Sequence, residues 1–112
     1  MGMSESAKES VAKVYANVLF ELAAESRTNE TVRREMQALA ELIAGNADFA
    51  AFLESPAISR GHKKNMLAKV FSGRFSELTM HFLAVAAARD RLGLLPAIIA
   101  AYRELEDART GL

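Results

Sequence analysis

The sequence of 112 residues has no cysteine, only two prolines, and six glycines that are scattered along the chain. Without cysteine, neither a disulfide framework nor a thiolate metal site is possible. The glycines form no GxxxxGK[ST] or GxGxxG loop of the kind that cradles phosphates. Net charge is also absent, since 14 basic residues balance 14 acidic ones. The chain therefore has no general electrostatic attraction to nucleic acid or to anionic lipid.

Long apolar runs are lacking as well, and none approaches the roughly 20 residues that span a bilayer. The first ten residues, MGMSESAKES, are polar and poor in arginine. They resemble neither a signal peptide, which has an apolar centre, nor a mitochondrial transit peptide. We therefore expect a soluble cytoplasmic protein, most easily a bacterial one, whose association with any membrane would run through partners.

Residues for catalysis or metal binding are scarce. The only histidines are His62 and His81, and His62 lies in the basic run 60–64, which would repel a cation. No histidine has an evident nucleophile partner, and no pair of carboxylates stands out. The basic run is too short for nucleic acid and lacks interleaved aromatic residues, so we interpret it as the solvated start of a helix. We expect no enzymatic activity, no metal ion and no cofactor.

Apolar residues do recur at helical spacing almost throughout the chain, and they make up 51% of it. This pattern predicts an all-α fold, a compact six-helix bundle over residues 1–108, with 109–112 as a frayed tail. The expected helices are 6–27, 28–44, 47–53, 60–72, 77–91 and 95–108.

Several residues mark the expected helix ends. Gly93 suits a left-handed residue after the fifth helix, and Pro96 suits the first turn of the sixth. The side chains expected to cap helix starts are Ser6, which would form a capping box with Glu9, and Asn46, Ser59 and Ser76. The residues expected to face the interior are Val32, Met36, Leu39, Leu42 and Ile43, then Phe52, Leu53, Leu67, Phe71 and Ile99, and the fourth helix also carries Met66 and Val70.

The first and fifth helices are apolar over a wider arc than the roughly 100° needed to cover a core. In the first, the apolar stripe is Val11, Val14, Tyr15, Val18, Leu19 and Leu22, and alanines widen it. Such a helix is either fully buried within its own chain or covered by something outside it. The spacing alone leaves both readings open, and small alanines would let a partner helix approach closely.

Three segments carry a resemblance to a known family. They are YANVLFELA at 15–23, FLESPAIS at 52–59 followed by Lys63, Leu67 and Phe71, and RLGLLP at 91–96 followed by YREL at 102–105. In this order they resemble the N-terminal domain of the ATP synthase delta subunit, called the oligomycin-sensitivity-conferring protein in mitochondria. The resemblance covers residues 11–104. Family members continue into a second, smaller α/β domain, so it implies a C-terminal domain that this chain does not include.

The resemblance implies a non-catalytic subunit of the peripheral stalk, which holds the catalytic head against rotor torque during ATP synthesis. In the family, the first and fifth helices form a groove for the N-terminal helix of an alpha subunit. The matching positions here are Val11, Tyr15, Val18, Leu22, Phe82, Val85, Ala86 and Arg89, with Leu19 and Thr79 one helical step away.

It further implies a peripheral location at the cytoplasmic face of a bacterial inner membrane, and contact with the stalk b subunit through the missing domain. The alternative that the residues leave open is a stand-alone helical interaction domain or a homodimer.

Overall fold

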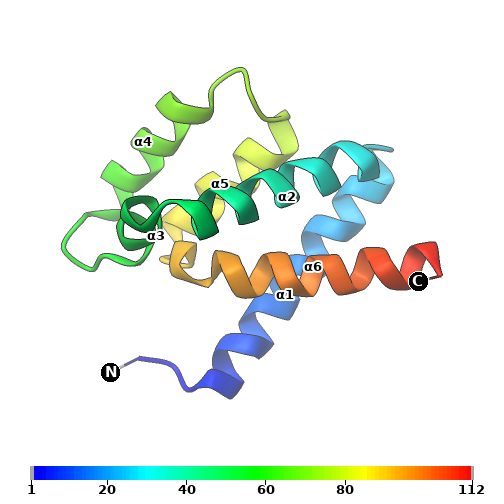
Figure 1. Cartoon of the computed structure of the whole chain (residues 1–112), viewed down its shortest axis with the longest axis horizontal. Helices are drawn as coiled ribbons and strands as arrows, with labels where there is room; N and C mark the ends of the chain where they lie inside the picture. The colour runs from blue at the N-terminus through cyan, green and yellow to red at the C-terminus, as the bar shows by residue number, and fades with distance from the viewer. Residues whose placement is uncertain (1, 112) are drawn as a thin grey trace.

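The computed structural model describes residues 2–111, which form six α-helices, one turn of 3₁₀-helix and no strand (Figure 1). The elements are α1 (Glu5–Glu25), α2 (Asn29–Gly45), α3 (Ala47–Glu54), α4 (Arg60–Phe71), α5 (Glu77–Ala88), η1 (Leu92–Leu94) and α6 (Leu95–Thr110). The predicted all-α, six-helix fold is confirmed.

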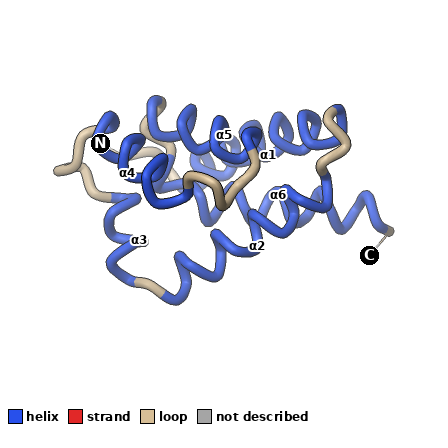
Figure 2. The backbone as a smooth tube through the Cα atoms, turned by 90° about the horizontal axis from the view of Figure 1, so that it is seen from above, coloured by secondary structure: helices blue, strands red, loops and turns tan. Residues whose placement is uncertain are grey.

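Helix α6 packs against α1 and α2. Figure 1 shows α1 crossing behind α6, and α1 makes its most extensive contacts with that helix. In the view of Figure 2, α1 and α5 lie on one side of the molecule and α2 on the other, with α6 between them. The second extensive pairing joins α4 to α5, whereas α1 and α5 touch only sparsely. That sparse contact leaves space between the two helices.

Helix α1 turns three alanines and Leu19 inward and leaves three other large apolar residues exposed. Its buried residues are Ala12, Ala16, Leu19 and Ala23. By contrast Val14, Val18 and Leu22 are 60%, 51% and 40% exposed. The apolar stripe of α1 is therefore not fully buried within the chain. The alanines face inward because they allow close approach of α6, whose fully buried side chains include those of Ile98 and Tyr102.

Most of the other expected core residues are buried. Leu53, Leu67, Phe71 and Ile99 are confirmed, as are Val32, Met36 and Leu39, while Phe52 and Ile43 are half-buried. The prediction was wrong for Leu42, which is exposed, as are Met66 and Val70 of α4. These three line a second hollow between α2, α3 and α4, with Phe49 and Phe52 in its walls.

Helix starts follow the local chemistry at most positions. The side chains of Asn46, Ser59 and Ser76 accept hydrogen bonds from N–H groups of the following helices, as predicted. Pro96 lies in the first turn of α6, also as predicted. The first cap differs, because Ser4 and not Ser6 accepts a bond from Ala7 N–H, at 3.1 Å. Helix α1 therefore begins at Glu5 and the expected capping box does not form.

Helix α5 ends at Ala88, three residues before the expected end. The left-handed residue is Asp90, with φ 59°, and not Gly93, which lies in the 3₁₀ turn. The Arg91 N–H then donates to Ala86 O at 2.7 Å, the wrapping bond of a Schellman ending. Aspartate tolerates the left-handed region better than most side chains, so the turn needs no glycine there.

Helix α6 continues to Thr110, two residues beyond the expected end at Ala108. Arg109, expected in a frayed tail, donates to Glu106 at 2.8 Å within the last turn. Gly111 follows in the left-handed conformation, with φ 80°. Residues 109 and 110, expected in a frayed tail, are thus part of α6, and for Leu112 the prediction lies outside the described residues.

Two buried charged side chains connect distant elements. The Lys63 ammonium is buried and donates to Leu53 O, at the end of α3, at 2.9 Å. The interpretation of residues 60–64 as a solvated helix start was therefore wrong for Lys63, although His62 is exposed as expected. The Glu35 carboxylate of α2 accepts bonds from Ser76 N–H and from the Thr79 hydroxyl, the latter at 2.6 Å. Glu35 thus holds the first turn of α5 against α2.

Candidate partner-binding groove

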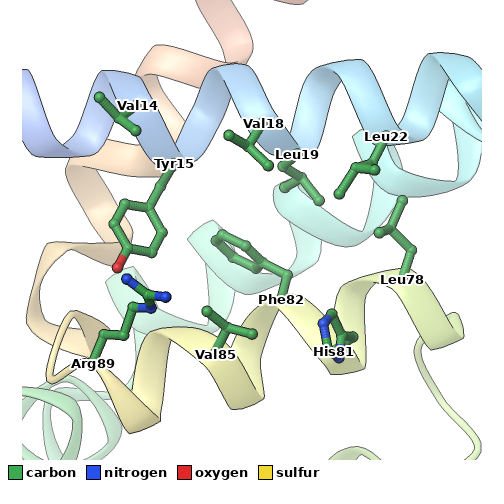
Figure 3. A pocket seen from close by; sticks show the side chains of 10 residues that line it. All are labelled: Val14, Tyr15, Val18, Leu19, Leu22, Leu78, His81, Phe82, Val85 and Arg89. Carbon is green, nitrogen blue, oxygen red and sulfur yellow. The ribbon is translucent and has the colours of Figure 1, made fainter.

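A hollow of about 320 Å³ lies between α1 and α5, and we call it the groove. Figure 3 shows α1 along one side and α5 along the other, with their side chains pointing toward one another. The lining residues are Val14, Tyr15, Val18, Leu19 and Leu22 from α1, and Leu78, His81, Phe82, Val85 and Arg89 from α5.

The spacing of the apolar residues explains why each helix presents a wall. On α1, the residues Val14, Val18 and Leu22 recur every four positions and form one row along the helix. On α5, Leu78, Phe82 and Val85 recur every four and three positions in the same way. The alanines of α1 are turned to α6, so the valines point away from the core and into the groove.

The groove is open to solvent although its walls are apolar. Buried Leu19 and Phe82 form its deeper part, while Val14 and Val18 on its rim are more than half exposed. Fully burying a valine or leucine side chain stabilises by about 1.5–3 kcal/mol relative to leaving it exposed. A partner that covered this rim would recover part of that stabilisation. Helix α1 is therefore not fully buried within its own chain.

Six of the eight predicted site residues line the groove: Tyr15, Val18, Leu22, Phe82, Val85 and Arg89. The other two do not. Val11 is half-buried and lies outside the lining set, and Ala86 is fully buried in the core. Ala86 does not line the groove because its face of α5 packs against the rest of the chain. Of the two neighbouring positions, Leu19 lines the groove, whereas Thr79 is buried against Glu35.

Sequence reasoning missed Val14, Leu78 and His81 as groove residues. The signal for Val14 was present, since it stands four residues before Val18 on the same row. Leu78 likewise precedes Phe82 by four positions. His81 lies on the rim and is exposed.

The polar side chains that line the groove are Tyr15 and Arg89 at one end and His81 on the α5 wall. Figure 3 shows the Tyr15 hydroxyl and the Arg89 guanidinium pointing toward each other at one end, with Leu22 and Leu78 at the other. Among residues 2–111, no three histidine or carboxylate side chains gather to hold a metal ion. No helix in that range is long and apolar enough to span a bilayer. What the groove offers is apolar surface for binding.

Comparison with known proteins places this fold in a family. Residues 11–112 match the family model of the ATP synthase delta (OSCP) subunit. The chain belongs to this family. The match covers both walls of the groove and all of α6, and the resemblance predicted from three short segments is thereby confirmed.

Individual members of the delta-subunit family agree. The ATP synthase subunit delta of Chlorobium chlorochromatii (strain CaD3) is 37% identical over 98 residues, which are 88% of this chain and 55% of that protein. The subunit of Symbiobacterium thermophilum is 33% identical over 102 residues, 91% of this chain and 55% of that protein. The subunit of Latilactobacillus sakei is 34% identical over 105 residues, with coverages of 94% and 58%. The chain thus spans little more than half the length of these relatives.

Proposed function

We propose that this domain is a non-catalytic part of the peripheral stalk of a proton-translocating ATP synthase. In this proposal the groove binds the N-terminal helix of an alpha subunit and so holds the catalytic head against rotor torque. The observation that carries it is the apolar, solvent-open groove between α1 and α5 in a chain of the delta-subunit family.

The dimensions of the groove suit a helix. From Val14 to Leu22 the α1 wall extends roughly 12 Å, since each helical residue rises 1.5 Å. From Leu78 to Arg89 the α5 wall extends roughly 16 Å by the same rule. Two to three turns of an amphipathic helix would cover this length, with residues three and four apart serving as anchors.

The chemistry of the groove suits a contact that must resist torque. Such a contact has to dissociate slowly, and the dissociation rate depends mainly on desolvated apolar anchors at its centre. Val18, Phe82 and Val85 supply that centre, and charges are confined to the ends. We further propose that the whole protein contacts the stalk b subunit through residues outside this chain, and that the complex lies at the cytoplasmic face of a bacterial inner membrane.

A competition experiment tests the stalk role. Membranes stripped of delta subunit are supplied with the full-length protein and increasing amounts of the 112-residue domain. The domain should occupy the catalytic head without joining it to the membrane sector, and so lower proton-driven ATP synthesis. ATP hydrolysis by free catalytic heads should continue unchanged. If the domain alone restored coupled synthesis, the proposed division of labour would be wrong.

A matched pair of variants makes the competition specific. Val85→Asp places a charge in the groove and should abolish competition. Val70→Asp makes the same change on the exposed surface of α4, in the second hollow, and should compete like the unchanged domain. Equal competition by both variants would contradict a role for the groove.

A homodimer through α1 and α5 is the alternative that the same exposed surface favours. Sedimentation equilibrium distinguishes the two, because a homodimer would double the 12.2 kDa mass. The stalk proposal predicts a monomer at micromolar concentration that gains mass only when the alpha-subunit peptide is added. A dimer that Val18→Asp dissociates would support the alternative.

A further inference from the structure

The two ends of the groove differ in charge. At the end where Tyr15 lies, the only charged lining residue is Arg89, whose guanidinium points toward the Tyr15 hydroxyl (Figure 3). At the opposite end, Leu22 and Leu78 supply only apolar surface. The charges that flank this second end come from the residues beside these two leucines.

Three glutamates lie close in sequence to the leucines at the opposite end of the groove. Glu21 precedes Leu22 by one residue, and Glu25 follows it by three, which places Glu25 near it along the groove side of α1. On α5, Glu77 directly precedes Leu78. All three glutamates are exposed, so they contribute negative charge to the rim without filling the groove.

Neighbouring charges reduce this difference but do not remove it. Near the Arg89 end, Asp90 and Arg91 follow in the same turn and offset each other, and Lys8 on α1 pairs with Glu5 at 3.5 Å. At the acidic end, Arg27 follows α1 and Arg74 precedes α5, and these two exposed arginines lower the formal excess from three negative charges to one. His81 also lies on this side of the rim and is exposed.

We infer that the groove binds its helix in one orientation, set by these charges. This inference rests on the proposed function, because it assumes that a helix occupies the groove. The acidic end of the bound helix lies at Arg89, and its basic end lies at Glu21, Glu25 and Glu77. Apolar contacts along the centre supply most of the affinity, while the end charges fix direction and register.

The difference in charge between the two ends of the groove also predicts the chain direction of the bound helix. Helices favour acidic residues in their first turn and basic residues in their last, because these complement the helix dipole. A helix of that kind would have its N-terminus at Arg89 and would run parallel to α1. The reverse placement brings its acidic turn against three glutamates, and like charges at a rim disfavour binding.

Paramagnetic broadening with two designed peptides tests this inference on the ¹⁵N-labelled domain. Both peptides carry the same amphipathic apolar face and the same composition. One has glutamates in the first turn and lysines in the last, and the other has these charges exchanged. Each bears a nitroxide at its N-terminus. The nitroxide of the first peptide should broaden the amides of Tyr15 and Arg89, and that of the second should broaden those of Leu22 and Leu78.

Each outcome separates this inference from the proposed function. If both nitroxides broaden the same end, backbone direction and not charge sets the orientation, and the inference is wrong. Equal broadening at both ends would overturn it as well. In either case the groove would still bind a helix, so the proposed function would stand. If neither peptide shifts any groove amide, the inference is wrong, whereas the proposed function is decided by titration with the alpha-subunit peptide itself.

A charge variant gives a second, independent readout. Arg89→Glu should weaken binding of the first peptide by about two- to fivefold, the range that exposed charge pairs contribute. In this variant the nitroxide of the first peptide should also no longer broaden the amides at one end of the groove more than those at the other. Lys69→Glu makes the same charge change on the exposed surface of α4, outside the groove, and should leave both quantities unchanged. Equal effects of the two variants would contradict a local role for Arg89.

Discussion

Glu35 offers the sharpest test of how α5 is held in place. Its carboxylate is buried and accepts hydrogen bonds from Ser76 N–H, from the Ser76 hydroxyl at 2.8 Å and from the Thr79 hydroxyl at 2.6 Å. These donors all belong to the N-cap and first turn of α5, where a negative charge also complements the helix dipole. Replacing Glu35 should therefore destabilise the packing of α5 on α2.

The magnitude follows from the bonds lost. In Glu35→Ala, three donors lose a charged acceptor, and leaving one such group unsatisfied costs about 1–3 kcal/mol. Because these costs overlap, we expect the free energy of unfolding to fall by about 3–5 kcal/mol. In Glu35→Gln the amide oxygen can still accept from Ser76 N–H, and both hydroxyls can reverse and accept from the amide. That variant should lose only about 1–2 kcal/mol.

Thermal unfolding followed by circular dichroism measures both effects. Glu35→Ala should lower Tm by about 10 °C or more, given about 4 °C per kcal/mol for a domain of this size. Glu41→Gln is the matched control, since Glu41 lies on the same helix, is exposed and bonds only the Gln37 side chain. If Glu35→Ala lowered Tm no more than Glu41→Gln does, the carboxylate would not be holding α5.

Three further predictions concern the core, the groove and the response to alkali. Phe71→Ala should lower the free energy of unfolding, measured with urea, by about 3–5 kcal/mol, because the ring is buried and stacks on Phe75 with centroids 4.8 Å apart. A loss below about 1 kcal/mol would show that Phe71 is not a core residue. Val85→Asp should keep the helical circular dichroism signal but lose binding of the alpha-subunit peptide, since the bound helix would bury an unpaired charge. If the isolated domain unfolded instead, Val85 would be a core residue. Burial raises the pKa of Tyr102 from 10.0 to about 12. The phenol therefore ionises first in the unfolded chain, and the free energy of unfolding should fall as pH rises from about 10 to about 12. If Tyr102→Phe showed the same dependence of this free energy on pH, the explanation would be wrong.

Local signals in the sequence predicted the helices well. The caps at Asn46, Ser59 and Ser76 depend only on residues three positions away, so the sequence contains all the information needed. The end of α5 was harder, because several residues there could adopt the left-handed conformation and Asp90 takes it in place of Gly93.

Features that depend on distant residues were not predictable in this way. The inward face of α1 is decided by close packing against α6, so a row of alanines is buried and Val14 and Val18 remain outside. Glu35 bonds a residue 41 positions further along the chain, and periodicity carries no information about such a pair. Six of the eight proposed groove positions line the groove, since the family resemblance supplied the pairing of α1 with α5 that spacing alone left open.

The central claim is that the groove between α1 and α5 binds a helix of the alpha subunit. Titrating the ¹⁵N-labelled domain with a peptide of the alpha-subunit N-terminus tests it most directly. The account predicts that the largest chemical-shift changes fall on groove residues such as Val18, Phe82 and Val85, and that they are absent in Val85→Asp. Shifts concentrated instead around Met66 and Val70, in the hollow between α2, α3 and α4, or no shifts at saturating peptide, would contradict it.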